Sequence, residues 1–150
     1  MQNLNLPAFA HKTRQMGKRL MIFDPFRKQW VVLTPEEWVR QHFLHWLCDS
    51  WGYPRGLMAV ETSLKYNQLS MRADAVVYGQ QGQPLMIIEC KAPHVTIDQQ
   101  TLEQAARYNF AFNTRYLMLT NGLQHYCCSI DTASGSLTFL EQIPHFSQLR

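Results

Sequence analysis

Residues 72–91 have the sequence RADAVVYGQQGQPLMIIECK, which predicts a β-hairpin. Two runs rich in β-branched and other apolar residues flank the turn-forming letters QQGQP. Side chains alternate between the two faces of a strand. If the turn is centred on Gln81-Gly82, Tyr78 faces Leu85 and Val76 faces Ile87. Asp74 then lies directly across from Glu89, with the two Cβ atoms about 4.5–5.5 Å apart. The hairpin therefore predicts a pair of opposed carboxylates.

These opposed carboxylates need a partner, because like charges in apolar surroundings destabilise a hairpin. A shared proton or a bound cation would offset the repulsion, and carboxylate oxygens suit Mg²⁺ or Mn²⁺. Lys91 lies two residues beyond Glu89 on the same face. An ammonium group there could lower the pKa of a water molecule or stabilise a developing phosphate charge. The alternative is that Asp74 and Glu89 are ordinary polar residues at strand ends.

Strand and helix signals continue on both sides of the hairpin. The letters TPEE at 34–37 begin a helix with an N-cap, a proline in the first turn and a capping box, and this helix ends before Gly52. A second helix begins at Asp98. Strands are predicted twice within 18–33 and at 58–64, 72–78, 85–91, 115–120, 124–130 and 136–140. This order predicts a mixed sheet with helices against it, in the α/β or α+β class.

The composition fits a single globular domain. Of 150 residues, 46% are hydrophobic and 17% are charged. No apolar run approaches the roughly 20 residues that cross a bilayer, and the first 15 residues lack the apolar core of a signal peptide. We therefore expect a cytoplasmic protein with no membrane partner and with free thiols. Residues 1–17 are predicted to be a flexible basic arm, and residues 18–150 a single domain.

Positive charge gathers near the N-terminus. Residues 1–30 contain six Lys and Arg against one Asp, whereas the other 120 residues contain eight basic and ten acidic side chains. Such a segment can bind phosphates without reading a base sequence. Trp30, in the same stretch, is a candidate for stacking on bases. The alternative is a solvated edge that only aids solubility. The candidate nucleic-acid contacts are Lys18, Arg19, Arg27 and Lys28.

The hairpin residues resemble a known nuclease motif. Asp74, followed by the letters ECK at 89–91, is similar to the D…(D/E)-x-K core of the PD-(D/E)XK nucleases. The longer pattern RADAVVY…PLMIIECKAPH…QAARYN…YLMLTNGLQHYC resembles the N-terminal nuclease domain of type I restriction enzyme R subunits, in particular small stand-alone bacterial proteins that carry it. The resemblance covers roughly residues 20–145. Ala73 replaces the leading proline of the motif, which varies within the superfamily.

This resemblance implies a restriction-endonuclease-like α/β fold, with a mixed sheet flanked by helices. It implies a metal-dependent DNA nuclease that hydrolyses phosphodiester bonds in restriction or repair. By the same resemblance, Asp74 and Glu89 would bind Mg²⁺ or Mn²⁺ together with the backbone carbonyl of Cys90. Lys91 would position or activate the attacking water.

The resemblance also implies roles for residues on the two helices. Gln104 and Tyr108 match the Q-x-x-x-Y motif of the RecB-like branch and share one helix face. The alternative is a polar helix face with one packed tyrosine. An acidic residue of the first helix would complete the site, and Glu36 is preferred to Glu37, which the capping box already explains. Arg72 and Tyr108 join the expected nucleic-acid contacts.

Two other functions stay open. One is a non-catalytic nucleic-acid-binding module, although a degenerate site would be expected to have lost Asp74, Glu89 or Lys91. The other is a subunit of a larger restriction or repair complex, because this domain is fused to a translocase in restriction systems. Such a subunit would act as a homodimer or with a separate helicase or methyltransferase.

Two further clusters have less support. His42, His45 and Cys48 occur at helical spacing, but Cys48 points about 60° away from His45, which argues against a zinc site. Cys90 with His94 would form a thiol nucleophile. Cys90, however, faces the opposite side of its strand from Glu89 and is predicted to belong to the core.

Overall fold

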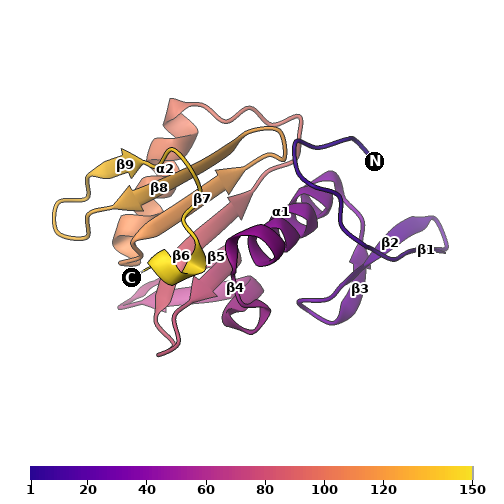
Figure 1. Cartoon of the computed structure of the whole chain (residues 1–150), viewed down its shortest axis with the longest axis horizontal. Coiled ribbons are helices and arrows are strands. Elements are labelled where there is room, and N and C mark those ends of the chain that lie inside the picture. The colour runs from indigo at the N-terminus through magenta and orange to yellow at the C-terminus, as the bar shows by residue number, and fades with distance from the viewer. Residues whose placement is uncertain (150) are drawn as a thin grey trace.

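A six-stranded sheet with the order β4-β5-β6-β7-β8-β9 forms the centre of the computed structural model, which describes residues 1–149 (Figure 1). Its neighbouring strands are antiparallel except β6 and β7, which are parallel. A parallel pair needs a crossover, which contains helix α2 (Gln99–Ala111). The strands are β4 (Met58–Tyr66), β5 (Leu69–Tyr78), β6 (Pro84–Cys90), β7 (Tyr116–Thr120), β8 (His125–Ile130) and β9 (Leu137–Phe139). The predicted mixed α/β sheet is confirmed.

Helix α1 (Pro35–Trp51) packs on one face of this sheet, and α2 packs on the other (Figure 1). Phe43 of α1 belongs to the same buried cluster as Val77 and Ile88. Leu102 of α2 packs instead with Leu119 of β7. Because Leu119 pairs with Glu89 in the parallel ladder, Glu89 lies on the α2 side of the sheet.

The predicted starts of both helices and the end of α1 are confirmed. The predicted capping box is wrong, because the Glu37 side chain pairs with Arg27 and Arg40 and the backbone N–H of Thr34 donates to the carbonyl of Val32. Thr34 caps α1 and accepts a 3.0 Å hydrogen bond from the backbone N–H of Glu37. Gly52 follows the helix with φ +72°, a conformation that glycine adopts without strain. Asp98 caps α2 and accepts a 2.8 Å hydrogen bond from the backbone N–H of Thr101. These caps fix where α1 and α2 begin relative to the sheet.

The predicted register of the central hairpin is confirmed where Val76 pairs with Ile87. The predicted pairing of Tyr78 with Leu85, nearer the turn, is wrong, because Tyr78 pairs with Pro84. A β-bulge between Val77 and Tyr78 causes this difference, since it leaves an extra residue on β6. The bulge lies on the turn side of the hairpin, so it does not alter the register at its open end.

A smaller antiparallel sheet contains β1 (Thr13–Met16), β2 (Arg19–Asp24) and β3 (Gln29–Val32). It lies beyond α1, at the opposite end of the molecule from α2 (Figure 1). The prediction of an unpatterned arm over residues 1–17 is wrong for β1. All four residues of β1 are exposed and pair with β2 through the backbone, so no apolar pattern marks this strand.

Within residues 1–149, neither helix has the length and hydrophobicity that a membrane crossing requires.

Candidate active site

Asp74 of β5 and Glu89 of β6 stand opposite each other at the open end of the hairpin. The ladder between β5 and β6 ends at the pair Ala75 and Ile88, and Asp74 and Glu89 are the residues that follow this pair on the two strands. Asp74 Oδ2 accepts a 2.7 Å hydrogen bond from the backbone N–H of Cys90, which directs its carboxylate toward β6. The side chain of Asp74 is only 14% exposed. Solvent therefore screens the charge of Asp74 poorly.

The partly buried carboxylate of Glu89 lacks contacts within residues 1–149 that would neutralise its charge. Among the described residues, its buried Oε1 atom has no hydrogen-bond partner. Burial, followed by the charge of Asp74, raises the pKa of Glu89 above the usual range of a carboxyl group. A proton on Glu89 or a cation between the two carboxylates would relieve this repulsion. The chemistry of the donors thus fits a hard divalent cation.

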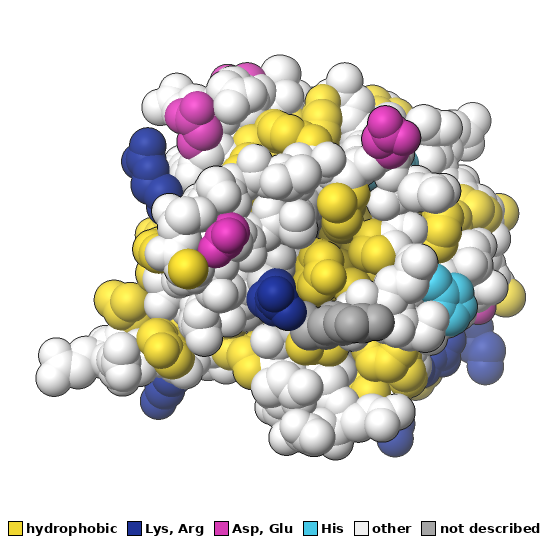
Figure 2. All heavy atoms as spheres, turned by 60° about the vertical axis from the view of Figure 1, so that its left-hand side comes forward, with side chains coloured by type: hydrophobic (Ala, Val, Ile, Leu, Met, Phe, Trp, Pro, Cys, Tyr) yellow, Lys and Arg dark blue, Asp and Glu magenta, His cyan; other side chains and the backbone are white. Residues whose placement is uncertain are grey.

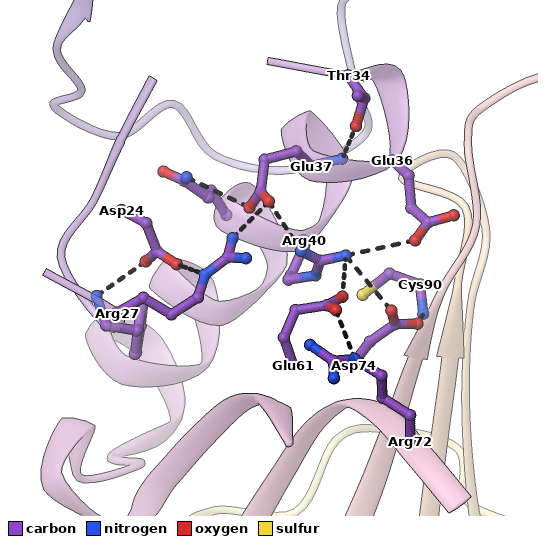
Figure 3. A network of polar contacts seen from close by, with 12 residues as sticks. Asp24, Arg27, Thr34, Glu36, Glu37, Arg40, Glu61, Arg72, Asp74 and Cys90 are labelled. Carbon is purple, nitrogen blue, oxygen red and sulfur yellow. Dashed lines mark hydrogen bonds and ion pairs between the residues drawn. The ribbon is translucent and has the colours of Figure 1, made fainter. Parts of the chain in front are cut away.

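Arg40 of α1 places a buried positive charge beside Asp74 (Figure 3). Its side chain is 6% exposed, and Nη1 lies 2.8 Å from Glu37 Oε1. Nη2 lies 2.9 Å from Glu61 Oε1, 3.3 Å from Glu36 Oε1 and 3.4 Å from Asp74 Oδ1. The guanidinium group therefore offsets part of the negative charge that surrounds Asp74.

The two acidic candidates on α1 have different environments. Glu37 is buried and forms ion pairs with Arg27 and Arg40. The side chain of Glu36 is 45% exposed, and burial followed by the charge of Asp74 raises its pKa. Glu36 is thus the candidate that remains open to solvent close to the carboxylate pair.

A cavity of about 440 Å³ lies between the sheet and α2. Its lining brings together five residues that the sequence predicts for the site, from β5, β6, the segment after β6 and α2: Arg72, Glu89, Lys91, Gln104 and Tyr108. Tyr108 is 51% exposed and is open to a ligand. The volume is large enough for part of a nucleotide chain.

Few side chains at the carboxylate pair could bind a metal ion. Within residues 1–149, no group of three or more His, Cys, Asp and Glu side chains is arranged to hold a metal ion. A cation at the carboxylate pair would therefore take its other ligands from backbone carbonyls and water. This pattern is usual for Mg²⁺, which keeps several water ligands.

The basic N-terminal candidates lie apart from this cavity. Lys18 lies just before β2, Arg19 is the first residue of β2, and Lys28 lies just before β3. Arg27 is instead engaged in ion pairs with Asp24 and Glu37 (Figure 3). Figure 2 shows one face of the molecule, on which the described Lys and Arg side chains are scattered and form no continuous band.

The less supported clusters have structural partners. His42 and His45 each place Nδ1 within 2.8 Å of a backbone carbonyl of α1, and Phe9 contacts both rings. Cys48 lies 3.7 Å from the sulfur of Met58. Cys90 is buried as predicted, and burial raises the pKa of its thiol far above the usual range. Trp30 packs against Phe23 and under Arg14.

Sequence reasoning missed Arg40 and Glu61 as part of the site. A signal for Arg40 exists, because a basic residue interrupts the apolar stripe that α1 turns toward the sheet. Glu61 has no comparable signal. It has φ +52° within β4, and this unusual backbone conformation is not visible in the sequence.

Comparisons with known proteins agree with the fold, an α/β protein in which two helices cover a mixed sheet. The family model described as "Type I restriction enzyme R protein N terminus (HSDR_N)" matches residues 35–144. The chain therefore belongs to this family.

A solved structure has a similar fold. It is described as a fragment of an HsdR subunit of a type I restriction enzyme from Vibrio vulnificus YJ016. The two share 18% sequence identity with a TM-score of 0.54, over 78% of this chain and 24% of that chain. This chain thus spans about a quarter of the length of its structural relative. A search of curated proteins found no match.

Proposed function

We propose that the protein is a metal-dependent DNA nuclease that hydrolyses phosphodiester bonds in restriction or repair. One observation carries this proposal: the buried Oε1 atom of Glu89 has no hydrogen-bond partner and belongs to a residue that lines the same cavity as Lys91. Membership of a family named for a restriction enzyme subunit supports the same assignment.

Asp74 and Glu89, with the backbone carbonyl of Cys90, would hold Mg²⁺ or Mn²⁺. A divalent cation bound there lowers the pKa of water and stabilises negative charge on a phosphate. Asp74 is kept in place for this task by the backbone N–H of Cys90 and by Arg40.

The other residues of the cavity would orient the reactants. The ammonium group of Lys91 would hold the attacking water and stabilise charge that develops on the phosphate. Gln104 would donate a hydrogen bond to a phosphate oxygen or to that water. Glu36, which remains solvent-accessible, is the acidic residue of α1 proposed to join them.

DNA contacts would come from two regions. Arg72 and Tyr108 line the cavity and would bind the phosphate and sugar groups next to the scissile bond. Lys18, Arg19 and Lys28 of the small sheet would add affinity that depends on salt and not on base sequence. Arg27 would act mainly through its ion pairs with Asp24 and Glu37.

A second candidate is a subunit that cleaves DNA only within a larger complex. It is favoured by one observation, that the structural relative is about four times longer than the matched region. The partner would be a second copy, or a helicase or methyltransferase subunit. A protein that binds Mn²⁺ and DNA but cleaves only when a partner is added would support this candidate.

The test is cleavage of single-stranded, linear duplex and supercoiled DNA in Mg²⁺ or Mn²⁺. We expect cleavage that EDTA abolishes and that added Mg²⁺ restores. The preferred DNA form would distinguish endonuclease from exonuclease action. If DNA is bound but no metal is bound and no form is cleaved, the protein is a binding module and the proposal fails.

A further inference from the structure

We propose that Arg40 is a positioning residue that supplies a permanent positive charge to the carboxylate site, and thereby limits how strongly the site attracts divalent cations. The inference rests on the proposed function, because it concerns the same carboxylates. It adds a residue to the site and predicts the direction in which metal affinity changes when that residue is removed.

Arg40 lies among several carboxylates. Arg40 Nη2 lies within 3.4 Å of carboxylate oxygens from three different elements, Glu36 of α1, Glu61 of β4 and Asp74 of β5. These carboxylates repel one another, and the buried guanidinium group between them offsets part of that repulsion. Arg40 therefore helps the backbone N–H of Cys90 to hold Asp74 in its place beside Glu89.

Arg40 is itself held in place by further ion pairs. Nη1 is fixed 2.8 Å from Glu37 Oε1, and that same oxygen receives a hydrogen bond from Arg27. Arg27 is in turn paired with Asp24 of β2. A series of alternating charges thus runs from the small sheet through α1 to Asp74, as Figure 3 shows. A guanidinium group presents five N–H donors in a fixed planar fork, whereas a lysine ammonium group presents three donors at the end of a flexible chain.

The backbone conformation of Glu61 also reflects its contact with Arg40. Its φ of +52° is unusual for a residue with a side chain, and it lies within β4. Such a conformation persists only where surrounding contacts enforce it. Here the side chain of Glu61 lies 2.9 Å from Arg40 and 3.0 Å from Arg72. These two ion pairs are the contacts that hold the backbone of Glu61 in this conformation.

The two effects of Arg40 on a bound divalent cation have opposite signs. Its guanidinium charge repels a cation at Asp74, while its hydrogen bond holds Asp74 in a position to act. Removal of a unit charge several ångströms away should strengthen cation binding by roughly tenfold even with water-like screening. The same removal frees Asp74 to move, which should slow cleavage. A residue that only stabilised the fold would not combine tighter metal binding with slower cleavage.

The experiment compares Arg40→Met and Arg40→Lys with the wild-type protein. Calorimetric titration with Mn²⁺ at low ionic strength gives the metal Kd, and single-turnover cleavage gives the rate. We expect Arg40→Met to bind Mn²⁺ roughly tenfold more tightly and to cleave at least tenfold more slowly. Arg40→Lys retains the charge, so its Kd should stay close to wild type while its rate falls. Arg55→Met removes the same charge from an exposed residue beside Phe26 and is the matched control for Kd.

The outcomes separate this inference from the proposed function. If wild type binds Mn²⁺ and cleaves DNA but Arg40→Met has an unchanged Kd or an unchanged rate, the role of Arg40 is wrong and the nuclease stands. If wild type binds no Mn²⁺, both are wrong. Circular dichroism checks the fold, since loss of one partner from a buried ion pair is strongly destabilising. If Arg40→Met does not fold, a wild-type cleavage rate in Arg40→Lys would overturn the inference.

Discussion

Asp74 Oδ2 accepts a 2.7 Å hydrogen bond from the backbone N–H of Cys90. This contact joins β5 to the last residue of β6 and holds the carboxylate of Asp74 next to that of Glu89. The charge of Asp74 and the burial of Glu89 together raise the pKa of Glu89. The open end of the hairpin therefore contains a carboxylate pair that a cation or a proton must stabilise.

Replacement of Lys91 by alanine should abolish cleavage and leave the fold and DNA binding nearly intact. The reason is that Lys91 lies after β6 and its side chain lines the cavity rather than the core. We expect at least a hundredfold loss of single-turnover rate in Mg²⁺. Lys65→Ala, at an exposed position of β4, is the control. An unfolded Lys91→Ala protein would mean that the lysine is structural.

Replacement of Glu37 by glutamine should destabilise the protein by about 3 kcal/mol. Glu37 is 5% exposed and pairs with both Arg27 and Arg40, so the amide removes the one carboxylate that these two guanidinium groups share. Urea unfolding followed by tryptophan fluorescence measures the change. Glu103→Gln, at an exposed position of α2, should change stability by less than about 0.5 kcal/mol. Equal effects of the two substitutions would contradict the role of Glu37.

Acidification should weaken the fold through the buried histidines. Burial lowers the pKa values of His42, His45 and His125 in the folded protein. The unfolded chain therefore binds protons at a higher pH than the folded protein. The stabilisation from these neutral rings is complete above about pH 6.5 and is lost as the pH falls through the lower folded values.

In a Glu89→Gln background, which lacks the carboxyl group whose raised pKa has the opposite effect, the urea midpoint should accordingly fall between about pH 7.5 and 5.5. His45→Asn should make this pH dependence shallower, because it removes one of the three groups. His94→Asn, at an exposed position, should leave the slope unchanged. A midpoint that is constant or that rises on acidification would show that the histidines do not act in this way.

Much of the fold could be predicted from local patterns. The hairpin register at Val76 and Ile87 followed from a turn centred on Gln81-Gly82, and the start of α1 from Thr34 at its N-cap. Strand β1 was missed because its residues are exposed and only its backbone pairs. The bulge next to Tyr78 was missed because the letters of the turn do not specify which strand carries an extra residue.

The site was only partly predictable, for a related reason. Asp74, Glu89 and Lys91 lie on one hairpin and just beyond it, so strand alternation was enough to bring them together. Gln104 reaches the same cavity from α2, and only the resemblance to a known motif indicated it. The contacts between Arg40 and Glu61 depend on how α1 sits against β4, and this long-range packing leaves no local sequence pattern.

The most direct test of the proposed nuclease is cleavage of supercoiled DNA in Mg²⁺ by Asp74→Asn and Asp49→Asn. Both substitutions remove one negative charge, but Asp49 is exposed near the end of α1 and Asp74 faces Glu89. The proposal predicts at least a hundredfold slower cleavage for Asp74→Asn and a wild-type rate for Asp49→Asn. Equal cleavage by the two variants would contradict a catalytic site at Asp74 and Glu89.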